Sequence, residues 1–346
     1  MGKITVVQYG LGPVGLEIVE TLLTRPWAEL VGAIDTDDDK VGKDVGQFLK
    51  TARQTGIIVR KETDDVLRRT APHVVTHSTS SEMQSIYPQL VTALEHGANV
   101  ISTAEELTYP FVKYPEAGQR LNDLAESKKR VVLGTGVNPG FLLDSLPVAL
   151  SGACQHVTSI RAERVVDAAR TSLPVQRRVG VGLTTPEFER RVADGSVRHV
   201  GLPESVGLIS LAMGWKVGEI QERITPIVAE RNLESGPVKV QAGLVAGIRQ
   251  VAKGILAGQE LVVLDLRTYV GAQNPHDSIM IEGVPTIDLT IRGGVQGDRA
   301  TPAIVVNSIP RLESLKPGLR TVIDLPPPSA RLNPIGEDRS VMLKTF

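Results

Sequence analysis

The residues with the clearest chemistry form the motif Gly10-Leu11-Gly12-Pro13-Val14-Gly15, which follows a strand-like run and precedes a helix-like one. Gly10 can make the tight turn that leaves a strand, and Gly12 has no Cβ to block a pyrophosphate. Gly15 lets the following helix pack closely on the sheet. Because the free N–H groups and the positive dipole end of the helix face this loop, the motif predicts an anion site.

Asp35 supplies the second half of the same fingerprint. It ends an apolar run at residues 30–34 and lies twenty positions after Gly15. An acidic side chain at that spacing accepts hydrogen bonds from the ribose hydroxyls of adenosine. A glycine cluster alone also marks ordinary turns, so it is the two features together that predict a dinucleotide site.

Three hydroxyl side chains, Ser78, Thr79 and Ser80, follow the strand expected at residues 73–77. In a doubly wound sheet the ligand lies beyond the carboxyl ends of the strands. We therefore expect these hydroxyls to line the cofactor cleft, although a cluster that caps the next helix explains them almost as well.

Thr103 and two adjacent carboxylates, Glu105 and Glu106, follow the next expected strand at residues 98–102. Paired carboxylates at the mouth of a nucleotide cleft are candidates for a functional site. Acidic residues also favour the first turn of a helix, so one of them could simply begin one.

The elements that must position these residues alternate between strand and helix. Strands are expected at residues 4–9, 30–34, 57–59, 73–77, 98–102 and 131–133, with helices after Gly15 and at 62–69, 82–96 and 115–129. This alternation predicts an α/β fold with an N-terminal Rossmann domain over residues 1–140. The domain ends in a shaped loop, Gly134-Thr135-Gly136-Val137-Asn138-Pro139-Gly140-Phe141.

Residues 141–298 differ from the first domain, because the expected strands there outnumber the expected helices. The strands are expected at residues 157–166, 223–229, 238–246, 261–270, 277–283 and 286–292, and the helices at about 142–149, from Thr185 and at 203–213. This pattern predicts a second, α+β domain built on an open, mostly antiparallel sheet. An apolar helix is expected to open at Gly297 and to end before Pro317, and the C-terminal segment, residues 299–346, is expected to return to the Rossmann domain.

Six strands with so few helices would leave one apolar face of the sheet uncovered. A second copy of the chain is the simplest cover, so we expect a homodimer.

Composition excludes several classes of protein. The 346 residues carry a net charge of −1 with scattered basic residues, which argues against a nucleic-acid partner. A single cysteine, Cys154, excludes an internal disulfide and a multi-cysteine metal site, and no pair of histidines with a carboxylate stands at metal-ligand spacing. With no signal segment and no apolar run near 18 residues, we expect a cytoplasmic protein with no membrane span and no metal.

Five motifs, in this order, resemble those of the 2,4-diaminopentanoate dehydrogenases and the native amine dehydrogenases. They are the glycine motif, Ser102-Thr103-Ala104-Glu105-Glu106-Leu107-Thr108-Tyr109-Pro110, the Gly134 to Phe141 loop, Glu163-Arg164-Val165-Val166-Asp167 and Gly297-Asp298-Arg299-Ala300-Thr301. The resemblance covers almost the whole chain. A wider kinship with dihydrodipicolinate reductases is implied by the fold, but their His-His and Lys signature is missing.

The resemblance implies reductive amination of a ketone or aldehyde by ammonia, with hydride from NAD(P)H, and the reverse oxidative deamination. The family's catalytic glutamate falls on Glu105, with Glu106 as second choice. Asn138 is implied to lie beside the nicotinamide and the substrate, and Arg164 to meet a substrate carboxylate where there is one. Phe141, Ala168 and Thr171 are candidates for the pocket wall.

Two other functional hypotheses compete with amine dehydrogenation. One is a different reductase on the same fold, acting on an aldehyde or hydroxy compound, for which a cleft lysine or histidine would be expected. His276 is a poor candidate, since a loop histidine is the simpler account. The other is a non-catalytic nucleotide sensor.

Asp35 also bears on cofactor choice, because it would repel the additional phosphate of NADPH. Lys40 and Lys43 could pair with that phosphate, but a flexible exposed lysine contributes only about 0–1 kcal/mol. We therefore expect NADH to be preferred and NADPH to be tolerated.

Overall fold

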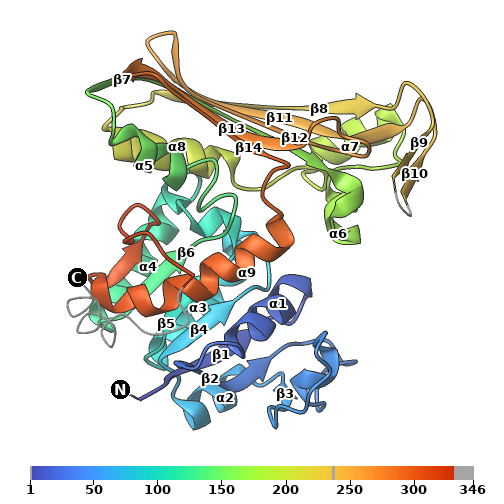
Figure 1. Ribbon diagram of the computed structural model, residues 1–346. Coiled ribbons are helices and arrows are strands. Elements are labelled where there is room, and N and C mark those ends of the chain that lie inside the picture. The colour runs from blue at the N-terminus through green and yellow to red at the C-terminus, as the bar shows by residue number, and fades with distance from the viewer. Residues whose placement is uncertain (1, 236–237, 331–346) are drawn as a thin grey trace, which may run out of the picture. The chain divides into compact units, whose positions relative to one another are not determined.

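The computed structural model describes residues 2–235 and 238–330 (Figure 1). The chain divides into two compact units, and each is described by itself. Unit 1 holds the residues up to Val137 and those from Gly297 onward, and unit 2 holds Asn138–Gln296. Of the C-terminal segment expected at 299–346, residues 331–346 lie outside the described residues.

Unit 1 is built on a seven-stranded sheet in the order β15-β6-β5-β4-β1-β2-β3. Every pairing in it is parallel. The order reverses between β1 and β4, which is where an open parallel sheet binds a dinucleotide. The predicted Rossmann fold is confirmed, with the strands β1 Ile4–Tyr9, β2 Ala28–Ile34, β3 Val59–Arg60, β4 Val74–His77, β5 Asn99–Ser102, β6 Val131–Gly134 and β15 Gly318–Arg320.

The helices of unit 1 bury one apolar stripe each against this sheet. Ile86 and Leu90 of α3, for example, are fully buried against Val75 and Val100. Burial of one such side chain contributes about 1.5–3 kcal/mol. The helix α9 packs against α1. The set is α1 Pro13–Leu22, α2 Thr63–Thr70, α3 Met83–Glu95, α4 Pro115–Ser127 and α9 Gly297–Ser308.

Unit 2 contains a six-stranded sheet in the order β14-β13-β7-β12-β11-β8. The β12–β7 pairing is parallel and the other pairings are antiparallel, so the sheet is mixed but mostly antiparallel, as predicted. Its strands are β7 His156–Asp167, β8 Glu219–Val228, β11 Val245–Leu256, β12 Gln259–Tyr269, β13 His276–Val284 and β14 Ile287–Arg292.

One strand of unit 2 was predicted wrongly. The segment 238–246 is not a single strand, because β10 (Val238–Val240) pairs with β9 (Leu233–Ser235) and the chain then turns at Gly243, whose φ is +86°. The long strand β11 begins only at Val245. Within β11, a Cβ on Gly254 would lie 2.8 Å from the Val206 side chain. The glycine therefore lets the helix that carries Val206 approach the strand closely.

The helices of unit 2 are α5 Ser145–Ser151, α6 Leu173–Arg178, α7 Thr185–Ala193 and α8 Leu202–Met213. Helix α8 packs with Val206 and Ile209 on Ile160 and Leu264 of the sheet. Figure 1 shows α5, α7 and α8 on the same side of the sheet, and no described helix of this unit on the other.

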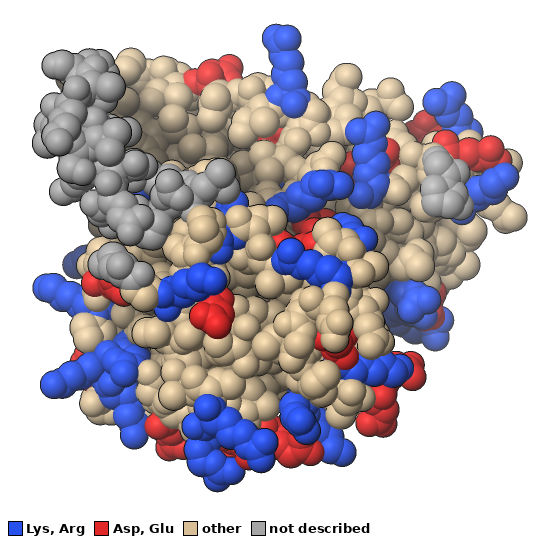
Figure 2. Space-filling model, turned by 60° about the horizontal axis from the view of Figure 1, so that its bottom comes forward, with Lys and Arg blue, Asp and Glu red and all other residues tan. Residues whose placement is uncertain are grey.

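The charges of the chain are interspersed. On the face turned toward the viewer in Figure 2, lysine and arginine side chains lie among aspartate and glutamate side chains, without a large patch of one sign. Among the described residues, no helix is both long and apolar enough to cross a membrane.

Candidate active site

The glycine loop between β1 and α1 has one open position. A Cβ on Gly10, whose φ is +91°, would lie 2.6 Å from the carbonyl oxygen of Ser78. A Cβ on Gly15 would lie 2.0 Å from the Gly10 oxygen, so Gly15 packs on the turn itself. A Cβ on Gly12 would meet no atom within 4 Å. The space over Gly12, at the N-terminus of α1, therefore fits a dinucleotide pyrophosphate.

Buried side chains of β1 and β4 support this turn. The Gln8 Nε2 donates to the Gly10 carbonyl at 2.8 Å and to the Ser78 Oγ at 2.9 Å. The Thr76 Oγ1 in turn donates to the Gln8 Oε1 at 2.7 Å. Gln8 and Thr76 were not among the predicted site residues. Their signal in the sequence is a polar side chain inside a buried strand next to the glycine motif.

The three predicted cleft hydroxyls have local partners. Ser78 supports Gly10, and the Thr79 Oγ1 donates to the Gln89 Oε1 at 2.6 Å. The Ser80 Oγ accepts from the backbone N–H of Glu82, just before α3. The Ser80 hydroxyl thus makes a local turn just before α3, and contact of these hydroxyls with the cofactor stays a prediction.

Asp35 lies directly after β2, against the glycine loop. Its Oδ2 accepts from the Leu11 N–H at 2.5 Å and its Oδ1 from the Asp37 N–H at 2.9 Å. The two lysines of the following loop have other partners: Lys40 pairs with Asp37 at 2.6 Å, and Lys43 donates to the Asp39 carbonyl at 2.6 Å. The Asp35 carboxylate is thus fixed beside the glycine loop, and its contact with the adenosine ribose stays a prediction.

A buried histidine fixes the chain ahead of the paired carboxylates. His77 contacts the Ser102 Oγ through Nδ1 at 2.9 Å and the Gln89 Oε1 through Nε2 at 2.7 Å. Burial lowers its pKa to about 4, so the ring is neutral near pH 7. The Ser102 Oγ also accepts from the Ala104 N–H at 3.1 Å, which anchors the residue before Glu105.

The two glutamates have different surroundings. Glu106 is 1% exposed; its Oε2 accepts from the Met83 N–H at 2.8 Å, and its Oε1 lies 3.4 Å from the Lys113 Nζ. This carboxylate caps α3 and belongs to the interior of unit 1. Glu105 is half-buried, so a part of its side chain remains accessible to a ligand.

The strand β6 ends close to this turn, at Gly134, where the loop to Phe141 begins. A Cβ on Gly134 would lie 2.6 Å from the Thr108 backbone nitrogen, so only glycine lets β6 end there. Two buried polar atoms of the loop, the Thr135 Oγ1 and the Asn138 Oδ1, have no hydrogen-bond partner among the described residues. Buried polar groups are rarely left unsatisfied, so these two atoms point to a ligand.

Asn138 and the residues after it are held inside unit 2. The Asn138 Nδ2 donates to the His199 Nε2 at 2.9 Å. The buried Asp144 carboxylate accepts from the Gly140 N–H at 2.8 Å and from the Ser205 Oγ at 2.7 Å. Burial raises the pKa of Asp144, and these hydrogen bonds act in the opposite direction.

Arg164 is a buried residue with fixed partners. It is 5% exposed, its Nη1 lies 3.1 Å from the Asp277 Oδ1, and its Nη2 donates to the Val295 carbonyl at 2.7 Å. Burial lowers the pKa of Arg164 and raises that of Asp277, while the pair's mutual attraction opposes both shifts. A substrate carboxylate at Arg164 would therefore meet a cation whose charge Asp277 already offsets in large part.

The remaining predicted wall residues differ in exposure. Ala168 is fully buried in a core with Val179 and Phe188. Thr171 is partly exposed, and its Oγ1 donates to the Ala168 carbonyl at 2.8 Å. Phe141 is partly exposed. Of these three, Phe141 and Thr171 have exposed surface that a substrate could contact, whereas the Ala168 side chain has none.

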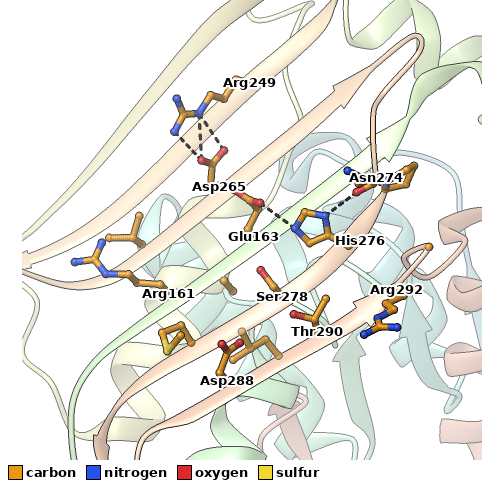
Figure 3. Close-up of a pocket in the computed structure, with 16 residues that line it drawn as sticks. Arg161, Glu163, Arg249, Asp265, Asn274, His276, Ser278, Asp288, Thr290 and Arg292 are labelled. Carbon is orange, nitrogen blue, oxygen red and sulfur yellow. Dashed lines mark hydrogen bonds and ion pairs between the residues drawn. The ribbon is translucent and has the colours of Figure 1, made fainter.

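A hollow of about 870 Å³ lies on the uncovered face of the unit 2 sheet. Figure 3 shows that its labelled side chains are charged or polar, from Arg249 on β11 to Arg292 on β14. Apolar residues such as Val263 and Met280 line the same hollow, so this face is mixed in character. The strand alternation places Ile160 and Ala162 of β7 against the helices and Arg161 and Glu163 on this face.

Several charges in this hollow are paired within the chain. Arg249 lies 2.7 Å from Asp265, and Arg267 lies 2.7 Å from Glu163. The His276 ring contacts the Glu163 Oε1 at 3.0 Å and the Asn274 carbonyl at 2.8 Å. His276 thus belongs to this ion-pair network, which holds no nucleophile with an adjacent base. Within residues 2–235 and 238–330, no three His, Cys, Asp or Glu side chains are grouped to hold a metal ion.

Comparison with known proteins gives matches over the whole fold. The family model of the 2,4-diaminopentanoate dehydrogenase C-terminal domain matches residues 141–340, and that of the dihydrodipicolinate reductase N-terminus matches residues 3–105. The chain is similar to the 2,4-diaminopentanoate dehydrogenase of Acetoanaerobium sticklandii, with 34% identity over 339 residues that cover 95% of both chains.

Two amine dehydrogenases are also similar. That of Streptomyces virginiae is 24% identical over 93% of this chain and 96% of its own. The solved structure of the amine dehydrogenase from Mycobacterium smegmatis superposes with a TM-score of 0.85 and 25% identity, over 95% of this chain and 98% of that one. These matches confirm the resemblance that the five motifs indicated.

Proposed function

Because the chain belongs to the 2,4-diaminopentanoate dehydrogenase family, we propose that it is an NAD(P)-dependent amine dehydrogenase. It reductively aminates a ketone or aldehyde with ammonia and catalyses the reverse oxidative deamination. The observation that carries the proposal is the carboxylate pair after β5. Glu106 is fixed inside unit 1, and the half-buried Glu105 beside it is the residue to which we assign the acid–base role.

In the direction of amination, Glu105 takes a proton from bound ammonium, and the ammonia that this releases bonds to the carbonyl carbon. The added nitrogen passes one proton to the carbonyl oxygen, which gives the neutral carbinolamine. Glu105 then returns its proton to the carbinolamine hydroxyl, which leaves as water and gives an iminium ion. Bound NAD(P)H supplies the hydride that reduces this carbon to the amine. Glu105 ends the cycle as it began, and a side chain in this role contributes typically about 10²–10⁴-fold in rate.

We propose the following binding roles. Gly10 to Gly15 hold the pyrophosphate, Asp35 binds the ribose, and Ser78, Thr79, Ser80 and Thr103 line the cofactor site. Asn138 orients the nicotinamide and the substrate, and Phe141, Arg164, Ala168 and Thr171 shape the substrate pocket. Because Arg164 is paired with Asp277, an uncharged carbonyl substrate fits this pocket better than an acidic one.

The test is oxidation of NADH in the presence of a panel of ketones and aldehydes, with and without ammonium. The proposal predicts oxidation that requires both. Oxidation without ammonium would indicate an aldehyde or hydroxy-compound dehydrogenase, and binding of NADH without turnover of any carbonyl compound would indicate a nucleotide sensor.

NADH is the preferred cofactor in this proposal, and Asp35→Ala is expected to raise the relative use of NADPH about tenfold or more. The carboxylate repels the additional phosphate, and Lys40 and Lys43 are engaged by Asp37 and the Asp39 carbonyl. Removing one like-charge contact worth about 1.4 kcal/mol corresponds to that factor. The measurement is the ratio of kcat/KM for the two cofactors in both proteins. A wild-type enzyme that already favours NADPH strongly would contradict the role of Asp35.

We further propose a homodimer through the uncovered sheet face, in the cytoplasmic location that its single cysteine suggests. Ion pairs on this face are neutralised within one chain, and Val263 and Met280 line the same hollow. Burial of these paired charges therefore leaves little charge without a partner. Light scattering at dilute concentration is expected to give the mass of two chains. Val263→Asp places an unpaired charge in the hollow and is expected to give one chain; a monomeric wild type would contradict the proposal.

A further inference from the structure

One buried histidine of unit 2, His199, is unused in the mechanism above. Its ring Nε2 lies 2.9 Å from the Asn138 Nδ2, which donates to it. An Nε2 that accepts a hydrogen bond carries no proton, so this contact requires the neutral ring with its proton on Nδ1. Burial, together with the charges of Arg178 and Arg164, lowers the pKa of His199 to about 3, which keeps the ring in that form throughout the working range of an enzyme.

The backbone of His199 is clamped to the sheet. Gln250 on β11, which is fully buried, accepts from the His199 N–H at 2.7 Å and donates to the His199 carbonyl at 2.7 Å. The Gln250 Nε2 also donates to the Glu222 Oε1 of β8 at 2.8 Å. The side-chain amide thus pairs with the His199 peptide as a neighbouring strand would. Such a fixed backbone is what a residue needs to orient another.

The amide of Asn138 is therefore held by one end. Its Nδ2 end is bound to His199, and its Oδ1 is buried with no partner among the described residues. Leaving a buried carbonyl unsatisfied costs about 1–3 kcal/mol. A bound group with an N–H would satisfy it. Asn138 follows the carboxyl end of β6 by four residues, and the ligands of an open parallel sheet bind beyond those ends.

We propose that His199 is a positioning residue, which holds the Asn138 amide so that its Oδ1 accepts a hydrogen bond from the carboxamide N–H of the nicotinamide. The inference rests on the proposed function only for the identity of the ligand. His199 touches neither the cofactor nor the substrate in this account. It acts by excluding the opposite orientation of the Asn138 amide, which would present a donor instead of an acceptor.

The test compares the affinity for two reduced nucleotides, NADH and its 3-acetylpyridine analogue, in which a methyl ketone replaces the carboxamide and removes the N–H. Titrations by fluorescence give both dissociation constants. Wild type is expected to bind NADH about tenfold more tightly, the equivalent of one hydrogen bond of roughly 1.4 kcal/mol. His199→Phe, which keeps a planar ring without an acceptor, is expected to reduce the ratio to within twofold. His199→Gln, whose Oε1 can accept from Asn138, is expected to restore most of it.

His96, at the C-terminus of α3, provides the matched control. Its ring contacts the Thr92 carbonyl and not Asn138, so His96→Phe is expected to keep the wild-type ratio. Equal affinities of wild type for the two nucleotides would overturn the proposal. An affinity ratio unchanged in a folded His199→Phe protein would also overturn it, even if the melting temperature of that variant were lower. If His199→Phe does not fold, His199→Asn, whose shorter amide does not reach Asn138, gives the same reading. These titrations need no turnover, so failure of the amination assay and failure of this proposal remain distinct.

Discussion

Glu105→Gln is expected to lower kcat/KM for amination by roughly 10²–10⁴-fold, with little change in thermal stability. The substitution keeps the shape of the side chain and removes the carboxylate that accepts the extra proton of ammonium. Glu105 is half-buried, and the turn that carries it is anchored by the hydrogen bond from the Ala104 N–H to the Ser102 Oγ, which the substitution leaves in place. Initial rates of NADH oxidation, with ketone and ammonium varied, give the effect on turnover.

Glu106→Gln is the matched control, with the opposite outcome. It weakens the hydrogen bond to the Met83 N–H and the pair with Lys113, which is expected to cost about 1–3 kcal/mol of stability. The folded variant is expected to keep most of its amination activity at a temperature well below its melting point. If Glu105→Gln kept near-full activity and Glu106→Gln lost it, the assignment within the pair would be wrong.

Gly12→Ala is expected to weaken NADH binding by about 100-fold while leaving the melting temperature of the free protein unchanged. A Cβ on Gly12 meets no protein atom within 4 Å, so the fold accommodates it, but the methyl group occupies the space proposed for the pyrophosphate. The expected loss corresponds to about 2.7 kcal/mol. Titration with NADH and thermal unfolding without nucleotide measure the two effects separately.

Gly15→Ala separates this effect from general damage to the loop. Its Cβ would lie 2.0 Å from the Gly10 carbonyl oxygen, so the turn must move, and both stability and nucleotide binding are expected to fall. A Gly12→Ala protein that bound NADH as tightly as wild type would show that the pyrophosphate does not lie over this loop.

The parts of unit 1 that face a ligand were predictable because their residues are local in sequence. The glycine motif, Asp35 and the helix-forming run after Gly15 all have a fixed spacing that one chain segment can reveal. Their supports were not predictable. Gln8 belongs to β1 and Thr76 to β4, and only the parallel pairing of these strands brings them into contact.

Unit 2 was harder to predict, since its strands mix residues of opposite character. Alternation along β7 places Arg161 on the uncovered face and Ala162 against the helices. The numbers of expected strands and helices therefore did not reveal the charged side chains on this face. The turn at Gly243 divides an apolar run that reads as continuous in the sequence. The contact between Asn138 and His199 joins residues 61 positions apart and had no local signal at all.

The most direct test of amine chemistry is to follow the nitrogen atom. Wild-type protein is incubated with NADH, a ketone that supports ammonium-dependent oxidation, and ammonium labelled with ¹⁵N, and the product is identified by mass spectrometry. The account predicts an amine that carries ¹⁵N, formed in a one-to-one ratio with the NADH consumed. In Glu105→Gln the amount of labelled amine is expected to fall by the same factor as the rate of NADH oxidation. An alcohol product without nitrogen, at the same consumption of NADH, would contradict it.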